Sequence, residues 1–244
     1  MTAEVAWIAL GFFLGGVMKG ATGVGAPLVA VPLLTMFYDL QTAIVLFAIP
    51  NCVPNLWQGW RFRHHRLDNR FVTRLFVCGA IGTAIGTAML ISLPSKWLVL
   101  VLVLSVYSYV VFRLAQPRWQ LSMPAAQSLV APVSAIAATL QGATGISAPV
   151  SVTFLNAMKL ERASFISSIS IFFLSVSAIQ LPALMLLGLL TTDKLLLGTL
   201  ALVPLFAGMP VGNLLARNLS RERFDQLILL GLTAVATRLL VGLF

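Results

Sequence analysis

Long apolar runs separated by short polar or charged segments make up most of the sequence. Six of these runs are continuous and have about the length that an α-helix needs to cross a membrane, roughly 20 residues. They cover residues of about 41–60, 71–93, 97–114, 163–188, 194–216 and 224–243. The pattern predicts six membrane-spanning helices.

Two further apolar stretches, 5–38 and 122–156, are too long for one helix, and a segment with Gly and Pro interrupts each of them. At a rise of ~1.5 Å per residue, each half is expected to span only about two thirds of a membrane. Each stretch is either one kinked crossing or a re-entrant hairpin that returns to the side it came from. The first begins right after Glu4 without a basic leader or a cleavage signal, so we expect it to stay in the mature protein.

The positions of Lys and Arg favour the hairpins. If both stretches are hairpins, the loops on the same side of the membrane as the basic segment 61–74 hold twelve basic residues. The loops on the other side hold only Lys96 and Lys194. The twelve are Arg61, Arg63, Arg66, Arg70, Arg74, Arg113, Arg118, Lys159, Arg162, Arg217, Arg221 and Arg223. A single crossing in the second stretch would change this division to eight against six. Because basic residues collect in cytoplasmic loops, we expect the segment 61–74 in the cytoplasm and both termini on the periplasmic side.

The two interrupting segments share one motif. G-A-T-G-x-x-A-P occupies 20–27 and again 142–149, with six of eight residues identical and an offset of 122. A G-x-x-x-G pattern also recurs, at 82–86 and 208–212. We therefore expect two copies of one unit, 1–121 and 122–244, each a broken helical hairpin followed by three transmembrane helices.

An odd number of crossings inverts the second copy relative to the first. Inverted repeats with broken helices are typical of secondary transporters. The alternative is a duplicated bundle in which the glycines only allow helices to pack closely.

Composition supports the membrane assignment. Hydrophobic residues make up 59% of the chain and charged residues 9%, whereas a soluble domain has about 25% charged residues. A soluble enzyme, a nucleic-acid-binding protein and a disordered protein are thereby excluded. The sequence predicts an all-α polytopic integral membrane protein in a lipid bilayer, and the net charge of +9 reflects its basic loops rather than contact with nucleic acid.

Each break is also a candidate anion site. Irregular backbone in a membrane must be buried in protein or line a polar cavity. Pro27 and Pro149 suit the first turn of a helix that starts after the break, and Thr22 or Ser147 could supply a capping hydroxyl. Two helix N-termini that point toward the protein centre would present free N–H groups to an anion. The expected binding residues of the breaks are Thr22, Gly23, Gly25, Thr144, Gly145 and Ser147.

Lys19 precedes the first motif by one residue, and Gln141 has the corresponding place in the second half. A Lys ammonium inside a bilayer needs a polar cavity or a counter-charge. The seven acidic residues all lie at the ends of spans or in loops, so a substrate anion is the expected counter-charge. The alternative is that Lys19 extends to a membrane surface or meets backbone carbonyls.

A polar strip follows in the next predicted crossing. Asn51, Asn55 and Gln58 share one helix face because they are spaced i, i+4 and i+7. The second half has a similar set, consisting of Ser170, Ser177 and Gln180. These side chains either line the substrate route or join helices by hydrogen bonds.

The segment 19–28, K-G-A-T-G-V-G-A-P-L, is followed by V-P-L-L at 31–34 and is repeated in weaker form in the second half. It resembles the TauE/SafE sulfite exporter family, also called the 4-toluene sulfonate uptake permease family, and the resemblance covers essentially the whole chain. The resemblance implies a transporter of the bacterial inner membrane that moves sulfite, sulfoacetate or another organosulfonate, commonly outward. Many members have consecutive glycines after the first break, whereas Ala26 and Pro27 follow Gly25 here, which points to a branch with another ligand.

Together these patterns predict a secondary transporter of a small anion that works by alternating access around a midplane site. A passive anion channel is one alternative. A membrane-embedded lipid phosphatase is another, and it would need catalytic acids, a His or an Arg–Ser cluster at membrane depth. We expect no cofactor and no metal, and a homodimer is compatible with this class of protein.

Overall fold

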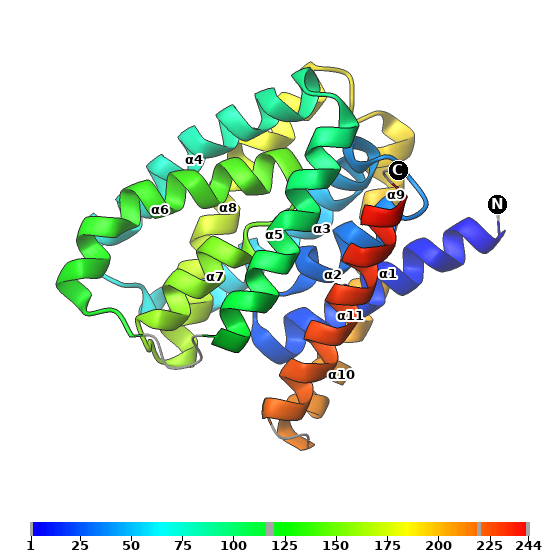
Figure 1. The fold of residues 1–244 in the computed structure, drawn as a ribbon. Coiled ribbons are helices and arrows are strands. Elements are labelled where there is room, and N and C mark those ends of the chain that lie inside the picture. The colour runs from blue at the N-terminus through cyan, green and yellow to red at the C-terminus, as the bar shows by residue number, and fades with distance from the viewer. Residues whose placement is uncertain (1, 116–119, 219–220, 243–244) are drawn as a thin grey trace.

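The computed structural model describes residues 2–115, 120–218 and 221–242, with the side chains of 2–5, 113, 217–218 and 221–228 left out of the description. Throughout these ranges the secondary structure is helical, which confirms the predicted all-α class (Figure 1). The helices are α1 (Thr2–Thr22), α2 (Ala26–Thr35), α3 (Leu40–Arg61), the short η1 (Arg63–His65), α4 (Asn69–Ser92), α5 (Ser95–Ala115), α6 (Met123–Thr144), α7 (Ala148–Ala157), α8 (Arg162–Leu186), α9 (Thr192–Leu200), α10 (Leu202–Asn218) and α11 (Arg221–Val241).

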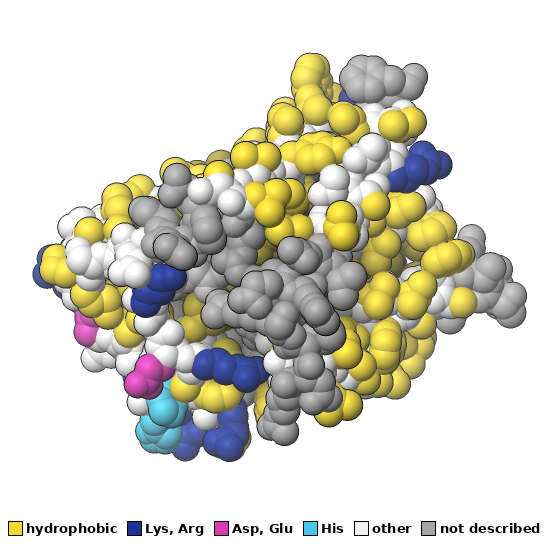
Figure 2. Space-filling model, turned by 60° about the horizontal axis from the view of Figure 1, so that its bottom comes forward, with side chains coloured by type: hydrophobic (Ala, Val, Ile, Leu, Met, Phe, Trp, Pro, Cys, Tyr) yellow, Lys and Arg dark blue, Asp and Glu magenta, His cyan; other side chains and the backbone are white. Residues whose placement is uncertain are grey.

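Six segments of the described chain are long and apolar enough to cross a membrane. They are α3, α4, α6 and α8, the Ser95–Phe112 part of α5, and Thr192–Ala216, which joins α9 to α10. The crossing predicted over about 194–216 corresponds to Thr192–Ala216, in which the single turn residue Ala201 separates α9 from α10. Hydrophobic side chains cover much of the surface in Figure 2, as expected for a polytopic membrane protein.

Each of the two long apolar stretches folds into a long arm and a short arm. α1 and α6 have 21 and 22 residues, and α2 and α7 have 10 each. These lengths correspond to about 32 Å and about 15 Å. The expectation that each half spans about two thirds of a membrane was wrong, because the helix continues through Gly20 and Gly142 and the chain breaks only at Gly23 and Gly145, whose φ angles are positive.

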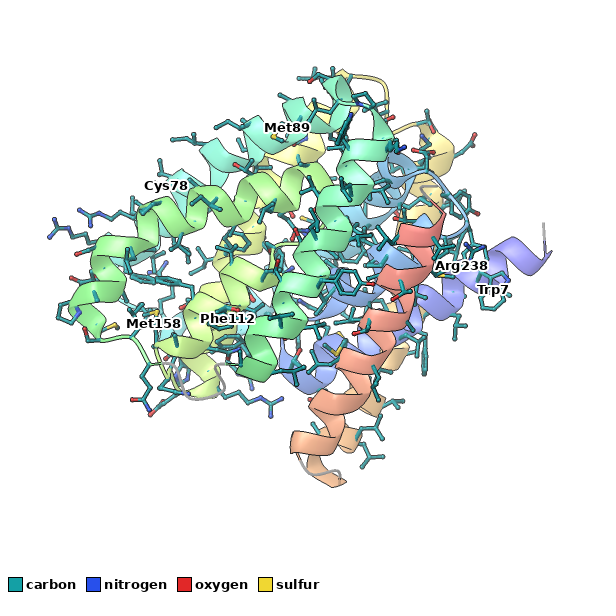
Figure 3. The ribbon with its side chains drawn as sticks, viewed as in Figure 1. Trp7, Cys78, Met89, Phe112, Met158 and Arg238 are labelled. Atoms are coloured by element: carbon teal, nitrogen blue, oxygen red, sulfur yellow. The ribbon has the colours of Figure 1, made fainter. Side chains whose placement is uncertain are left out.

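Both stretches return to the end from which they start, and the hairpin prediction is confirmed. The ring of Trp7, near the start of α1, stacks on Phe37, which follows α2, at 5.1 Å between centroids. In the second hairpin, the N–H of Leu121 donates a hydrogen bond of 2.8 Å to the carbonyl of Ala157. Met158 accordingly lies beside the start of α6 (Figure 3).

The helix ends gather at two ends of the molecule. We call residues 61–74, 121–127 and 157–162 the basic end. There, Arg74 donates to the carbonyl of Gln127 at 3.0 Å, and the Gln127 amide donates to Asp68 at 3.2 Å. The histidine side chains of Figure 2 lie at one edge of the molecule together with Lys and Arg side chains.

We call residues 35–40, 95–99 and 238–242 the opposite end. They line a common pocket of about 270 Å³ that includes Asp39, Ser95 and Arg238. The charge of Lys194 acts on Asp39 in the same region. Figure 1 shows the start of α1 and the end of α11 at this end. The two termini therefore share one side of the molecule, while the assignment of that side to the periplasm stays a prediction.

The basic residues divide between the two ends as the hairpin topology requires. The described side chains at the basic end are Arg61, Arg63, Arg66, Arg70, Arg74, Lys159 and Arg162. Lys96, at the start of α5, lies at the opposite end. The other predicted cytoplasmic side chains, those of Arg113, Arg118, Arg217, Arg221 and Arg223, lie outside the part of the chain whose side chains are described.

The closest helix contacts occur twice, with partners exchanged between the halves. α4 packs on α6 where a Cβ at Gly86 would overlap the carbonyl oxygen of Thr139. α1 packs on α10 where a Cβ at Gly212 would overlap the carbonyl oxygen of Val17. Thr139 follows Val17 by 122 residues, and Gly212 follows Gly86 by 126, which are the offsets of the two sequence motifs. Each G-x-x-x-G segment thus contacts the long hairpin arm of the other half.

Candidate functional site

The centre of the molecule contains α3 and α8, one helix from each half, packed antiparallel. The side-chain amide of Asn51 donates to the hydroxyl of Ser177 at 3.4 Å. Gly59, two turns further along α3, lies instead against Ser170 and Leu174 of α8. The two helices therefore run in opposite directions. The predicted polar strip of α3 faces the equivalent helix of the other half.

Lys19 joins this strip from α1. It is 2% exposed, and its Nζ donates a hydrogen bond of 2.8 Å to Oδ1 of Asn55. The Asn55 amide in turn donates to the carbonyl of Asn51 at 2.7 Å. The alternative in which Lys19 extends to a membrane surface was wrong. We call Lys19, Asn51, Asn55 and Ser177 the central polar cluster.

The charge of this cluster is not neutralised by any carboxylate in the described part of the chain. Asp39, Asp68 and Glu161 are the N-cap residues of α3, α4 and α8, and Asp193 lies in the first turn of α9. A buried ion pays a desolvation cost of several kcal/mol, and a hydrogen bond to a charged group restores only about 1.5–3 kcal/mol. The ammonium has three N–H donors, and the bond to Asn55 uses one of them. An anion at this position would stabilise Lys19.

The first break, between α1 and α2, is held by a threonine hydroxyl. Oγ1 of Thr22 accepts hydrogen bonds of 3.2 Å from the N–H groups of both Val24 and Gly25. Gly23 has φ +84°, a conformation that favours glycine, and its N–H donates to the carbonyl of Lys19 at 2.7 Å. The backbone bond places the break next to the helical turn that carries Lys19.

The second break, between α6 and α7, repeats this backbone arrangement. Oγ1 of Thr144 accepts from the N–H of Ile146 at 3.3 Å. Gly145 has φ +75°, and its N–H donates to the carbonyl of Gln141 at 2.8 Å. The equivalent residues of the two halves therefore have equivalent backbone roles.

The first turns of the short arms α2 and α7 contain the predicted prolines but not the predicted capping hydrogen bonds. Pro27 and Pro149 lie in the first turns of α2 and α7, which confirms that prediction. The N-cap residues are Gly25, which has no side chain, and Ser147, whose hydroxyl accepts no backbone N–H of α7 in the described structure. The capping role expected for Thr22 or Ser147 was wrong, because Thr22 bonds the loop before the helix and the Ser147 hydroxyl accepts from Ser151 instead.

Two of the expected glutamines support the second break rather than the central polar cluster. Nε2 of Gln141 donates to the carbonyl of Gly145 at 2.8 Å, and Nε2 of Gln180 donates to the carbonyl of Gly142 at 3.1 Å. Oε1 of Gln141 and Oε1 of Gln58 are buried, and neither has a hydrogen-bond partner among the described residues. These oxygens are open acceptors inside the protein.

The structure places the two breaks at opposite ends of the α3–α8 pair. Gly23 lies against Ile166 in the first turns of α8, at the basic end, whereas Gly145 lies against Ile44 in the first turns of α3. Thr22, Gly23 and Gly25 are therefore separated along the pair from Thr144, Gly145 and Ser147. The side chains that do meet midway along it are those of the central polar cluster.

Two buried hydroxyls next to Ser170, those of Ser167 and Ser168, were not predicted as site residues from the sequence. Ser167, Ser168 and Ser170 are all 0% exposed, and within the described part of the chain no hydroxyl of the three has a hydrogen-bond partner. Ser134 and Ser175, by contrast, donate to backbone carbonyls at 2.6 and 2.7 Å. An unsatisfied buried polar group costs about 1–3 kcal/mol. The sequence signal was available, because three serines within four residues are unusual in an otherwise apolar helix.

The fold and its centre define a polytopic membrane protein that keeps its polar chemistry inside the helical bundle. Ionisable residues in such interiors mark the pathways of substrates and ions, so the class indicated is a membrane transport protein. The chain matches the family model described as sulfite exporter TauE/SafE over residues 7–239 and belongs to this family. No curated protein and no solved structure matches the chain.

Proposed function

We propose that this protein is a secondary transporter that exports sulfite or a small organosulfonate and binds it at the central polar cluster. The family is one of sulfite and related anion exporters. The observation that carries the proposal for this chain is Lys19, which is 2% exposed and hydrogen-bonded to the neutral amide of Asn55. A buried cation with a neutral partner is the electrostatic requirement for an anion site.

The chemistry of the cluster suits an oxyanion. A sulfonate or sulfite group has several oxygens in a compact arrangement, and each can accept a hydrogen bond. Charge-assisted hydrogen bonds from an ammonium are roughly twice as strong as neutral ones. Lys19 would supply the charge, while the Asn51 amide and the Ser177 hydroxyl, which bond each other only at 3.4 Å, would turn toward the ligand.

Alternating access is supported by the exchanged contacts of the two halves. An axis in the membrane plane that relates 1–121 to 122–244 would produce the pairs Gly86–Thr139 and Gly212–Val17. Broken helices and inverted repeats of this kind occur in secondary transporters. Since one break lies at each end of the α3–α8 pair, we propose that each hairpin controls access from one end.

The burial of the cluster favours a carrier over a passive channel. Asn51, Asn55 and Ser177 are 5%, 2% and 5% exposed, so the protein closes around the cluster at both ends. A closed state of this kind is an expected step in alternating access, whereas a conducting channel needs a continuous open path.

Counterflow in proteoliposomes tests the proposal. Vesicles preloaded with sulfite, sulfoacetate, taurine or sulfate would be diluted into a trace of labelled anion, with protein-free vesicles as the control. Saturable uptake of one anion is the expected result. An anion current without counterflow would favour a channel, and the absence of both from folded protein would contradict transport of these anions.

A further inference from the structure

The half of α8 nearest the basic end presents hydroxyls to α3. A Cβ at Gly59 would lie 3.8 Å from the Cβ of Ser170, so Ser170 faces α3 two residues before the basic segment begins. Ser167 lies three residues earlier on the same helix face. Both side chains are fully buried, and in the described structure neither hydroxyl has a partner.

Gln58 adds a third open polar group at the same depth of the bundle. It directly precedes Gly59 on α3, is 4% exposed, and its Oε1 has no hydrogen-bond partner. Several other buried hydroxyls donate to the carbonyl four residues earlier, as Thr83 does to Gly79 and Ser151 to Ser147. Open polar groups thus accumulate between the central polar cluster and the basic end.

The corresponding region at the opposite end has no such hydroxyls. The residues 122 positions before Ser167 and Ser170 are Val45 and Ala48. Both are buried, and they form an apolar cluster with Leu184 and Leu190. The two halves therefore differ where their equivalent helices approach the two ends of the molecule.

We propose that Ser167 and Ser170 form a second anion subsite between the basic end and the central polar cluster. Hydroxyl groups donate hydrogen bonds to an oxyanion without holding it as strongly as a cation does, which suits a site through which the anion passes. The apolar cluster of Val45, Ala48, Leu184 and Leu190 is the seal on the other side, because a hydrated anion cannot cross it without losing its water. The subsite rests on the proposed transport function and adds a direction to it, with entry from the basic end.

The first break is placed to open this route. Gly23 lies against Ile166, the residue before Ser167. A movement of the first hairpin away from α8 would therefore expose the serines before it exposes Lys19.

Sided thiol labelling tests the subsite. Ser170→Cys and Ala48→Cys would be made in a background in which Cys52 and Cys78 are replaced by Ala, and a membrane-impermeant thiol reagent would be added to either face of oriented vesicles. Exposed His64→Cys identifies the basic face, and exposed Leu187→Cys identifies the other. We expect Ser170→Cys to react about tenfold or more faster from the His64→Cys side than from the other side, through a minor open state, with Ala48→Cys slow from the His64→Cys side.

Ser167→Cys provides a second variant at the same subsite and should show the same sidedness. Added sulfite or organosulfonate should slow the modification of both serine variants. Equal rates from the two faces, or an Ala48→Cys variant that reacts as fast as Ser170→Cys from the basic face, would overturn the subsite. Sided labelling together with absent counterflow would leave the route intact and reject the transport function on which it rests.

Discussion

The two breaks have the same backbone and different chemistry. In each, a threonine hydroxyl bonds the loop, and a glycine with φ of +84° or +75° donates to the residue four positions earlier. That earlier residue is Lys19 in the first half and Gln141 in the second. Lys19 reaches across to Asn55, whereas the Gln141 side chain turns back to the carbonyl of Gly145.

The difference between Lys19 and Gln141 shows which part of the duplicated motif forms the turn and which part carries charge. The Gly-Ala-Thr-Gly pattern forms the turn in both halves, so it specifies a fold rather than a ligand. The charge is present on one side only. We infer that the second hairpin has mainly a structural and gating role, while the first delivers the residue that recognises the anion.

The largest effect, on anion affinity, is expected when Lys19 of the first half is replaced by Gln, the residue at the equivalent position of the second half. Lys19→Gln removes the buried charge while keeping a side chain that can hydrogen-bond. Loss of a charged hydrogen bond worth about 1.5–3 kcal/mol should weaken apparent anion affinity about 10- to 150-fold. The concentration dependence of counterflow measures this change, and exposed Lys159→Gln is the matched control. If Lys19→Gln shows the same concentration dependence as the control, the charge of Lys19 does not distinguish the two halves in anion binding.

The exchanged helix contacts should respond alike in the two halves. A Cβ at Gly86 or Gly212 would overlap a backbone carbonyl of the facing helix, and overpacking costs typically about 1–3 kcal/mol. Gly86→Ala and Gly212→Ala should therefore lower the thermal unfolding midpoint in detergent by similar amounts. Gly231→Ala is the control, because a Cβ there meets nothing within 4 Å. A large effect at one glycine and none at its counterpart would contradict the two-fold arrangement.

The two turns should also be about equally sensitive to an added side chain. Gly23→Ala and Gly145→Ala each force alanine into the left-handed region, at a cost of roughly 1–2 kcal/mol. Each Cβ would also lie 2.9 Å from a side-chain atom of a β-branched residue, Ile166 or Val31, which is stiff at χ1. Gly188→Ala, with φ +67° and open space around it, isolates the backbone part of the cost. Thermal unfolding midpoints should fall more for the two break variants than for this control.

The smallest effect, on stability, is expected just after each hairpin, where Asp39 and Glu161 are the N-cap residues of α3 and α8. Burial alone would raise the pKa of Asp39, but the hydroxyl and N–H of Thr42 and the charge of Lys194 lower it below its usual value. Glu161 makes no side-chain cap bond. Loss of a cap costs about 0.5–2 kcal/mol, so Asp39→Ala should destabilise the protein more than Glu161→Ala.

The pH dependence of that difference follows from the direction of the pKa shift. A carboxyl whose pKa is lower in the folded protein stabilises it above the pKa of the unfolded chain, about 3.9. This stabilisation is lost as the pH falls through the lower, folded value. The gap between wild type and Asp39→Ala in unfolding midpoint should therefore be constant near neutral pH and shrink in acid. A gap that does not change with pH would contradict ionisation of Asp39 as its cause.

Much of the fold was predictable because a chain in a membrane must satisfy its backbone hydrogen bonds internally, which restricts it to a few architectures. Apolar length located the crossings, and the distribution of basic residues selected hairpins, which the contacts Trp7–Phe37 and Leu121–Ala157 confirm. Arm length was not predictable from composition. A helix can continue through glycines such as Gly20 and Gly142 when close packing against another helix removes the advantage of breaking there.

The candidate site was predictable in its residues but not in its assembly. Lys19, Asn51 and Asn55 were identified by polarity in an apolar setting, and the structure brings them together. Gln141 and Gln180 have the same polarity but bond the backbone of the second break. Which of these two roles a buried amide takes depends on long-range packing, and one sequence does not contain that information.

Equilibrium binding of labelled anion to purified protein tests the central claim most directly. Wild type, Lys19→Met and the exposed control Lys159→Met would be compared for the anion identified by counterflow, with thermal unfolding used to verify that each is folded. The account predicts saturable binding by wild type and Lys159→Met, and a loss of affinity of at least about tenfold for Lys19→Met. Equal affinity of all three proteins would contradict the assignment of Lys19 as the residue that binds the anion.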